Sequence, residues 1–199
     1  MKTEHDEDYV KRFFRSGAYF NIFEPEECSN KKLSAIQTQE RLDIPEITKP
    51  KGKTVLDVGT GKGRLAISFA LAGAKRVTAV DLSEDILRIA EENTRAAGVS
   101  GIVSFELGDV ENLKYRDELF DIVCSIDTFL YLPHPQKGMN VLGRVCKRGG
   151  IVVVNIGNAN YHYFTEKVQS LLAKSSIAYV LVTGVYYSRL FSPVRKKLA

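Results

Sequence analysis

Residues 54–66 read TVLDVGTGKGRLA, and this stretch decides the fold. An apolar run, Thr54–Val58, stops at Gly59, and Arg64–Ala72 follows with the apolar spacing of a helix. Glycines at positions 59, 61 and 63 let the backbone turn tightly and approach a ligand closely. The stretch therefore predicts a strand, a glycine-rich turn and a helix, with a ligand-binding loop at the carboxyl end of the strand.

The same alternation of short apolar runs and helical periods continues to residue 156. Five strands alternating with four helices are expected. Mostly apolar strands separated by helices indicate an α/β fold with a parallel sheet covered on both faces, and right-handed crossovers make it doubly wound. The remaining predicted strands are Arg76–Val80, Val103–Leu107, Phe120–Ile126 and Ile151–Ile156; clear helical periods follow Ser83 and span Pro135–Cys146, and a turn is expected at Gly149-Gly150.

Length and composition limit the classes of protein to which the chain can belong. With 199 residues the chain makes one domain with at most a small appendage, and 44% hydrophobic and 26% charged residues are typical of globular proteins. A net charge of +4 is too weak, alone, to indicate a nucleic-acid partner. The three cysteines, Cys28, Cys124 and Cys146, include no CxxC pair, which disfavours disulfide frameworks and zinc knuckles and favours a reducing, cytoplasmic compartment. No metal site is expected.

The flanks differ from the central alternating pattern. Residues 1–50 are expected to form an N-terminal helical segment broken at Pro25, residues 51–160 the core, and residues 161–199 a C-terminal helix and tail. The acidic, polar N-terminus does not resemble a signal peptide. Val168–Ser188 carries a single charge, Lys174, but is too polar to favour a membrane span, so we expect it to be buried or interfacial.

The glycine loop is compatible with only some nucleotide-binding patterns. In a dinucleotide fingerprint G-x-G-x-x-G counted from Gly59, the third glycine falls at position 64, which is Arg64. A phosphate-binding P-loop is absent as well. The pattern is instead D-x-G-x-G-x-G, with Asp57 two residues before the first glycine.

At this point the chain resembles the class I, Rossmann-like S-adenosylmethionine-dependent methyltransferases. Five stretches carry the resemblance in the family's order, VLDVGTGKGRLA, VTAVDLSEDIL, LGDVENL, FDIVCSIDTFLYL and VLGRVCKRGGIVVVN, within residues 52–157. The resemblance implies a sheet of strand order 3-2-1-4-5, continued by a sixth strand and an antiparallel seventh. Because only about 25 residues follow the helix expected at Tyr161–Lys174, we expect this continuation to be incomplete.

The family resemblance also implies S-adenosylmethionine as cofactor and S-adenosylhomocysteine as product. Asp57 would lie near the methionine end, Asp81 would accept hydrogen bonds from the ribose hydroxyls, and Asp109 would accept one from the adenine amino group. Two apolar side chains would enclose the adenine. The full set implied for cofactor binding is Asp57, Gly59, Thr60, Gly61, Asp81, Leu82, Asp109, Val110 and Ser125.

The sequence indicates the residues that meet the methyl acceptor less specifically than those that bind the cofactor. The catalytic residue remains unknown, and the weak candidates Asp127, Tyr131 and His134 lie in the loop after the fourth strand, where the family usually meets its acceptor. For His134, a position on the surface without a catalytic role is an equal alternative. For Tyr131, a place in the wall of the site is an equal alternative to acid–base catalysis. The aromatic segment from Tyr9 to Phe23 either covers the site or packs as an amphipathic helix on the core.

The sequence therefore favours a methyltransferase acting on a small-molecule acceptor. Three alternatives stay open: a non-catalytic S-adenosylmethionine-binding partner subunit, a nicotinamide-dependent oxidoreductase, and an RNA methyltransferase using Tyr186, Tyr187 and the basic tail. An incomplete sheet edge would also favour self-association through residues 160–190.

Overall fold

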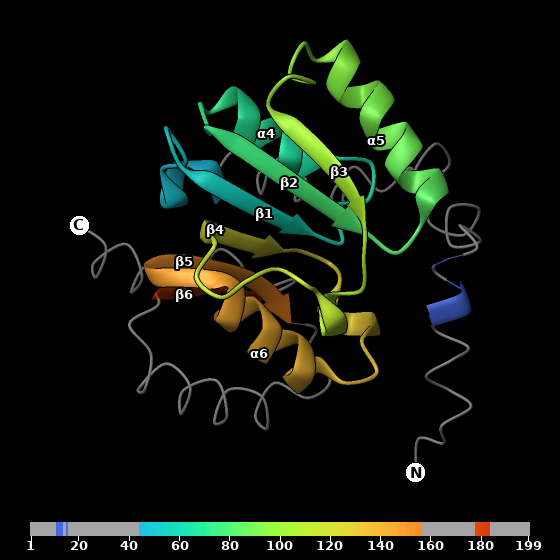
Figure 1. The fold of residues 1–199 in the computed structure, drawn as a ribbon, viewed down its shortest axis with the longest axis vertical. Coiled ribbons are helices and arrows are strands. Elements are labelled where there is room, and N and C mark those ends of the chain that lie inside the picture. Colours follow the sequence, from blue (N-terminus) through green and yellow to red (C-terminus); the bar gives the residue numbers. More distant parts are fainter. Residues whose placement is uncertain (1–10, 14, 16–43, 157–177, 184–199) are drawn as a thin grey trace.

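The computed structural model describes residues 11–13, 15, 44–156 and 178–183 (Figure 1). Within the central range, strands and helices alternate as expected. The elements are β1 (Thr54–Val58), α4 (Arg64–Leu71), β2 (Arg76–Asp81), α5 (Glu84–Ala96), β3 (Val103–Leu107), the 3-10 turn η1 (Val110–Asn112), β4 (Phe120–Ser125), the 3-10 turn η2 (Phe129–Tyr131), α6 (Pro135–Val145), β5 (Cys146–Ile156) and β6 (Ala178–Thr183).

The strands form one six-stranded sheet in the order β3-β2-β1-β4-β5-β6. This confirms the predicted 3-2-1-4-5 order. All pairings among the described strands are parallel, including β5 with β6, so the antiparallel strand implied by the resemblance is not among them. Strand β6 extends the sheet beside β5, so the sixth strand implied by the resemblance is present.

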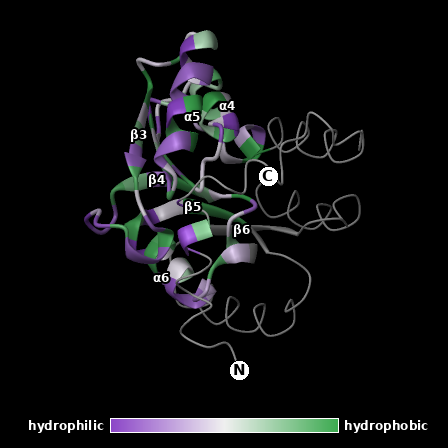
Figure 2. Cartoon of the chain, turned by 90° about the vertical axis from the view of Figure 1, so that its right-hand side faces the viewer, coloured by the Kyte–Doolittle hydropathy of each residue, from purple (hydrophilic) through white to green (hydrophobic). Residues whose placement is uncertain are grey.

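Hydrophobic clusters cover both faces of the sheet, because successive strand residues point to opposite sides. Val55 joins the cluster that packs under α4, whereas Leu56 joins the cluster under α6. In Figure 2 hydrophobic positions concentrate on the strands between the helices, and hydrophilic positions mark α5 and α6. The doubly wound arrangement is therefore confirmed. The predicted core cysteines Cys124 and Cys146 are both buried, and Cys28 lies outside the described residues.

Helix α5 begins as the sequence predicts. The Ser83 hydroxyl accepts a hydrogen bond from the Ile86 N–H at 3.4 Å, and Glu84 and Asp85 occupy the first turn. Both features stabilise a helix N-terminus. The start of α5 is thereby fixed directly after the last residue of β2, Asp81, which positions that carboxylate for the site described below.

The helix predicted between the third and fourth strands is absent. Between β3 and β4 the chain makes only the short turn η1, so the stretch 54–156 holds three α-helices rather than four. Residues 44–48, near the end of the segment expected to be helical, are helical despite Pro45, and Ile44 is 3% exposed. Proline is tolerated in a first helical turn because its missing N–H has no partner there.

Strand β5 starts earlier than predicted. Cys146 is its first residue rather than the end of a helix, and Gly149-Gly150 lies inside the strand, where the register with β4 shifts between Phe120 and Ile122. A β-bulge accounts for the glycines, since Gly149 has a φ of +74°. Gly150 lies against its neighbours: a Cβ there would be 2.7 Å from Cys146 Sγ and 2.8 Å from the Asp121 carbonyl oxygen.

Gly150→Ala should therefore lower the free energy of unfolding by about 2 kcal/mol through overpacking against backbone. Gly149→Ala is the matched control, because a Cβ at Gly149 meets no atom within 4 Å and carries only the cost of positive φ, about 1 kcal/mol. Urea denaturation of both variants measures the difference. Equal destabilisation would contradict the bulge geometry.

Candidate functional site

The glycine loop is held at the carboxyl ends of β1 and β2. The Gly59 and Thr60 N–H groups both donate to the Val80 carbonyl oxygen, at 2.8 and 3.0 Å. Gly59 has a φ of +70°, and a Cβ there would lie 2.0 Å from Thr128 Oγ1. The loop is thus enclosed by the end of β2 on one side and by the loop after β4 on the other, and only glycine fits at this position.

Asp81 connects the glycine loop to the start of α5. Its Oδ2 accepts a hydrogen bond from Gly61 N at 2.9 Å, and its Oδ1 accepts one from Ser83 N at 3.1 Å. Asp81 is 9% exposed, and burial raises the pKa of its carboxyl group above the ordinary value. Gly61 has a φ of +55°, and a Cβ there would meet no atom within 4 Å. The backbone beside this carboxylate therefore faces open space that a ligand can enter.

Asp57 and two hydroxyl residues lie deeper. Thr60 Oγ1 donates to Asp57 Oδ2 at 2.7 Å, and Ser125 Oγ donates to the Val58 carbonyl oxygen at 2.9 Å. Asp57 is 2% exposed, and this burial raises the pKa of its carboxyl group to about 6, although the Thr60 hydrogen bond opposes the rise. Thr60 and Ser125 thus use their hydroxyl protons to fix the loop and the strand end.

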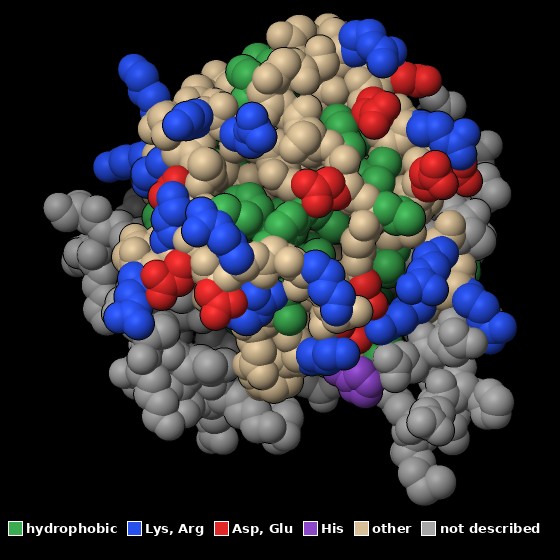
Figure 3. All heavy atoms as spheres, in the orientation of Figure 1, with side chains coloured by type: hydrophobic (Ala, Val, Ile, Leu, Met, Phe, Trp, Pro, Cys, Tyr) green, Lys and Arg blue, Asp and Glu red, His purple; other side chains and the backbone are tan. Residues whose placement is uncertain are grey.

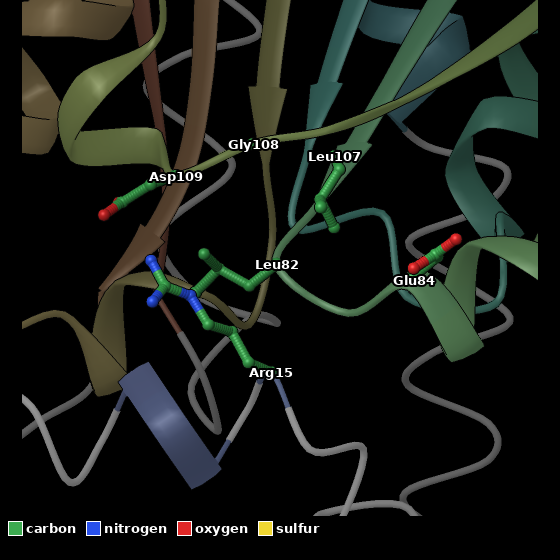
Figure 4. A pocket seen from close by; sticks show the side chains of 6 residues that line it. All are labelled: Arg15, Leu82, Glu84, Leu107, Gly108 and Asp109. Carbon is green, nitrogen blue, oxygen red and sulfur yellow. The ribbon is translucent and has the colours of Figure 1, made fainter.

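Leu82, the residue after Asp81, lines a pocket of about 390 Å³, which is within the range of small-ligand sites (Figure 4). In Figure 4 the Arg15 side chain rises from the N-terminal helical segment between Leu82 and Asp109. Val110 is 3% exposed, and its side chain packs in the core beneath α6 instead of on the pocket wall. The residues that line the pocket are Arg15, Leu82, Glu84, Leu107, Gly108 and Asp109.

Sequence reasoning missed two charged residues around Asp109. Lys11 Nζ lies 2.9 Å from Asp109 Oδ2 and 3.0 Å from Glu111 Oε2. Glu111 is 1% exposed, and its N–H donates to Asp109 Oδ1 at 2.9 Å. A glutamate inside the third quoted motif was visible in the sequence, but nothing local indicated that a lysine about 100 residues earlier would reach it.

The three acceptor-side candidates do not form one group. Asp127 has a φ of +58° and lies 3.8 Å from Arg64 Nη2. Tyr131 is 39% exposed; burial and the negative charge of Asp127 raise the pKa of its phenol. His134 is exposed at the start of α6, and its backbone N–H donates to Glu111 Oε1 at 2.7 Å. The structure thus brings Asp127 near Tyr131 and Arg64, while His134 contributes a backbone contact elsewhere.

Other predictions concern parts of the chain that are only partly described. Most of the aromatic segment from Tyr9 to Phe23, the tail with Tyr186 and Tyr187, and most of residues 160–190 lie outside the described residues. In the described ranges, no three His, Cys, Asp or Glu side chains are grouped so as to hold a metal ion. The helices of those ranges also lack the length and apolar composition that a bilayer crossing requires.

Comparison with known proteins identifies the family. A family model described as a methyltransferase domain matches residues 49–186. The chain belongs to this methyltransferase family. The match includes the whole alternating core from β1 to β6, so the motifs quoted above and the observed strand order point to the same family.

Three similar proteins show how far the likeness extends. The methyltransferase GfsG of Streptomyces halstedii is 32% identical over 59% of this chain and 41% of its own length. A ubiquinone biosynthesis O-methyltransferase of Coxiella burnetii is 30% identical over 65% of this chain and 56% of its own length. The solved structure of the cyclase SpnF matches with a TM-score of 0.55 and 30% identity, over 57% of this chain and 42% of that one.

The chain thus spans about half the length of these relatives. The three proteins carry different names, including that of a cyclase, so the reaction of this chain has to be argued from its own site.

Replacing the buried Asp57 carboxylate should change the pH dependence of stability. Because burial raises the pKa of Asp57 from 3.8 to about 6, the folded chain holds the proton more tightly than the unfolded chain, and Asp57 lowers stability as pH rises between these values. Asp57→Asn keeps an acceptor for Thr60 and removes the titration. Relative to the unsubstituted chain, its free energy of unfolding should gain about 2 kcal/mol between pH 4 and pH 7.

Thermal and urea denaturation across that pH range measure the effect. Asp85→Asn is a suitable control because Asp85 is exposed in the first turn of α5. A pH-independent difference between Asp57→Asn and the unsubstituted chain would contradict the assignment of the raised pKa to Asp57.

Proposed function

We propose that this methyltransferase-family chain binds S-adenosylmethionine and transfers its methyl group to a small-molecule acceptor. The observation that carries the proposal is the Asp81 carboxylate, which is held by Gly61 N–H and Ser83 N–H and directly precedes Leu82, a residue that lines the pocket. Each carboxylate oxygen has a further lone pair for a hydroxyl donor. A ribose with two adjacent hydroxyls matches this arrangement of two oxygens.

The neighbouring pocket fits the purine end. Leu82 supplies an apolar wall, and Asp109 supplies a carboxylate on the same pocket surface. An exocyclic amine donates to such a carboxylate, and a planar ring packs on such an apolar wall. We expect Val110 to contact the base only through its backbone, because its side chain packs in the core.

Asp57 supports the methionine end. Its buried carboxylate lies beneath the glycine loop and takes one hydrogen bond from Thr60. A cationic amino group above the loop would favour the ionised form of Asp57 and offset part of the cost of burying that charge. We therefore expect the cofactor and Asp57 to stabilise each other.

S-adenosylmethionine, when bound, supplies a methyl group activated by its sulfonium, so the protein contributes mainly positioning and exclusion of water. Tyr131 is suited to donate a hydrogen bond, because a phenol is protonated at neutral pH and burial raises the pKa of this one above its ordinary value. Asp127, beside it, can accept a proton from an acceptor that must lose one. His134 is not needed in this arrangement.

A small-molecule acceptor is favoured over RNA. On the face shown in Figure 3, Lys and Arg side chains are interspersed with Asp and Glu side chains instead of forming one basic surface. One relative is named for ubiquinone biosynthesis, which concerns a small molecule. Steeply salt-dependent RNA binding would overturn this part of the proposal.

A second function, the binding of S-adenosylmethionine without methyl transfer, is favoured by the comparison with SpnF. SpnF is similar to this chain at 30% identity and is named a cyclase. Formation of S-adenosylhomocysteine in the presence of pooled small-molecule acceptors would exclude this function. Its absence with every pool, together with tight cofactor binding, would support it.

Asp81→Ala should weaken the binding of S-adenosylmethionine and S-adenosylhomocysteine by about a hundredfold, because two charge-assisted hydrogen bonds are lost. Isothermal titration calorimetry measures both affinities, with NADH as a ligand that we expect not to bind. Asp85→Asn, four residues away on the exposed side of α5, should leave both affinities unchanged. The proposal is overturned if the unsubstituted chain binds neither ligand or if Asp81→Ala binds both normally.

A further inference from the structure

Three segments far apart in the sequence meet at Lys11. The lysine belongs to the N-terminal helical segment, Asp109 and Glu111 flank the start of η1, and His134 begins α6. Lys11 Nζ bridges Asp109 Oδ2 at 2.9 Å and Glu111 Oε2 at 3.0 Å. The other Glu111 oxygen, Oε1, accepts a hydrogen bond from the His134 N–H at 2.7 Å.

Glu111 is the buried member of this group. Its side chain is 0% exposed, whereas the side chains of Lys11 and Asp109 are 18% and 16% exposed. A carboxylate removed from water needs a cation and hydrogen-bond donors, and removing one partner of such a pair is strongly unfavourable. Lys11 is the cation; burial lowers the pKa of its ammonium group, but the hydrogen bonds and charges of Asp109 and Glu111 raise it by more.

The group borders the pocket. Asp109 lines the pocket directly, and Arg15, four residues after Lys11, also lines it, with its guanidinium group between Leu82 and Asp109 (Figure 4). The Lys11 contacts therefore hold a wall of the pocket in place. Without Lys11, the Asp109 and Glu111 carboxylates would lie side by side with no cation between them, and their repulsion would turn Asp109 away from its present orientation.

We propose that Glu111 is a positioning residue that acts through Lys11: it fixes the N-terminal segment and the Asp109 carboxylate as walls of the cofactor pocket. Through His134 it also fixes the start of α6, directly after the loop that carries Asp127 and Tyr131. One buried side chain thereby ties the cofactor pocket to the acceptor-side loop. This inference rests on the proposed function, because it assigns the group a role in cofactor affinity.

The two links of Glu111 can be separated by substitution. Lys11→Met removes the cation and keeps the His134 contact. Glu111→Gln keeps a carbonyl oxygen for the His134 N–H but removes the negative charge that holds Lys11. Each should weaken S-adenosylhomocysteine binding by about tenfold, within the usual range of coupling between a site and residues around it. The double variant should lose no more than either single variant, because both act through one contact.

Two variants serve as controls. Lys11→Arg keeps a cation that can reach both carboxylates and should bind within about threefold of the unsubstituted chain. Lys114→Met removes an exposed lysine that donates to Asn112 Oδ1 in the same region, and it should have no effect. Lys11→Met leaves the buried Glu111 carboxylate without its cation, so its melting temperature should fall, and the titrations are run well below it. The double variant removes both charges and should recover the melting temperature but not the affinity, whereas a merely structural role would restore both.

The titrations use the full chain, with S-adenosylhomocysteine as the probe, and hydrogen exchange of the His134 amide as a second measurement. Exchange should accelerate in Glu111→Ala, which loses the acceptor, and stay slow in Glu111→Gln. If the unsubstituted chain does not bind the probe, the proposed function fails and this inference with it. If it binds, but Lys11→Met and Glu111→Gln bind equally well, only the inference is overturned.

Discussion

The Asp81 carboxylate is the group on which the arrangement of the site depends. Its two oxygens hold the Gly61 N–H on one side and the Ser83 N–H on the other, so the glycine loop and the start of α5 share one anchor. This arrangement requires β1 and β2 to be adjacent and parallel, because only then do the loop after β1 and the end of β2 meet at one edge of the sheet. The strand order and the site are therefore consequences of the same packing.

Most of the fold could be predicted because its signals are local. Apolar runs such as Thr54–Val58, the Ser83 cap and the glycines at strand ends each act over a few residues, and the structure confirms them. Gly149-Gly150 was misassigned because a bulge depends on the partner strand, which a single stretch of sequence does not contain. The connection before β4 was misassigned because a turn as short as η1 has no helical period to detect.

The residues of the candidate site also divide into those whose positions follow from local sequence and those whose positions depend on distant parts of the chain. The positions of Asp57, Gly59, Gly61 and Asp81 follow from one strand–loop–helix unit and its neighbour, and the structure brings them together at one edge of the sheet. Lys11 and Glu111 escaped prediction because their contact joins residues 100 positions apart. Local pattern carries no information about such a pair, and only the packing of the N-terminal segment beside η1 brings the two charges together.

The buried carboxylates suggest how stability and binding are related here. Asp57 and Glu111 are both almost fully buried, yet Glu111 has a lysine within 3.0 Å while Asp57 has a hydroxyl donor and the more distant positive charge of Arg64. A buried carboxylate without a close cation destabilises the free protein, and a cationic ligand relieves that cost on binding. Under the proposed function, the cationic cofactor would balance the charge of Asp57 on binding, whereas Lys11 already balances the charge of Glu111 in the free chain. That difference is why substitution of Asp57 should stabilise the free chain at neutral pH, whereas substitution of Glu111 should loosen the pocket walls around it.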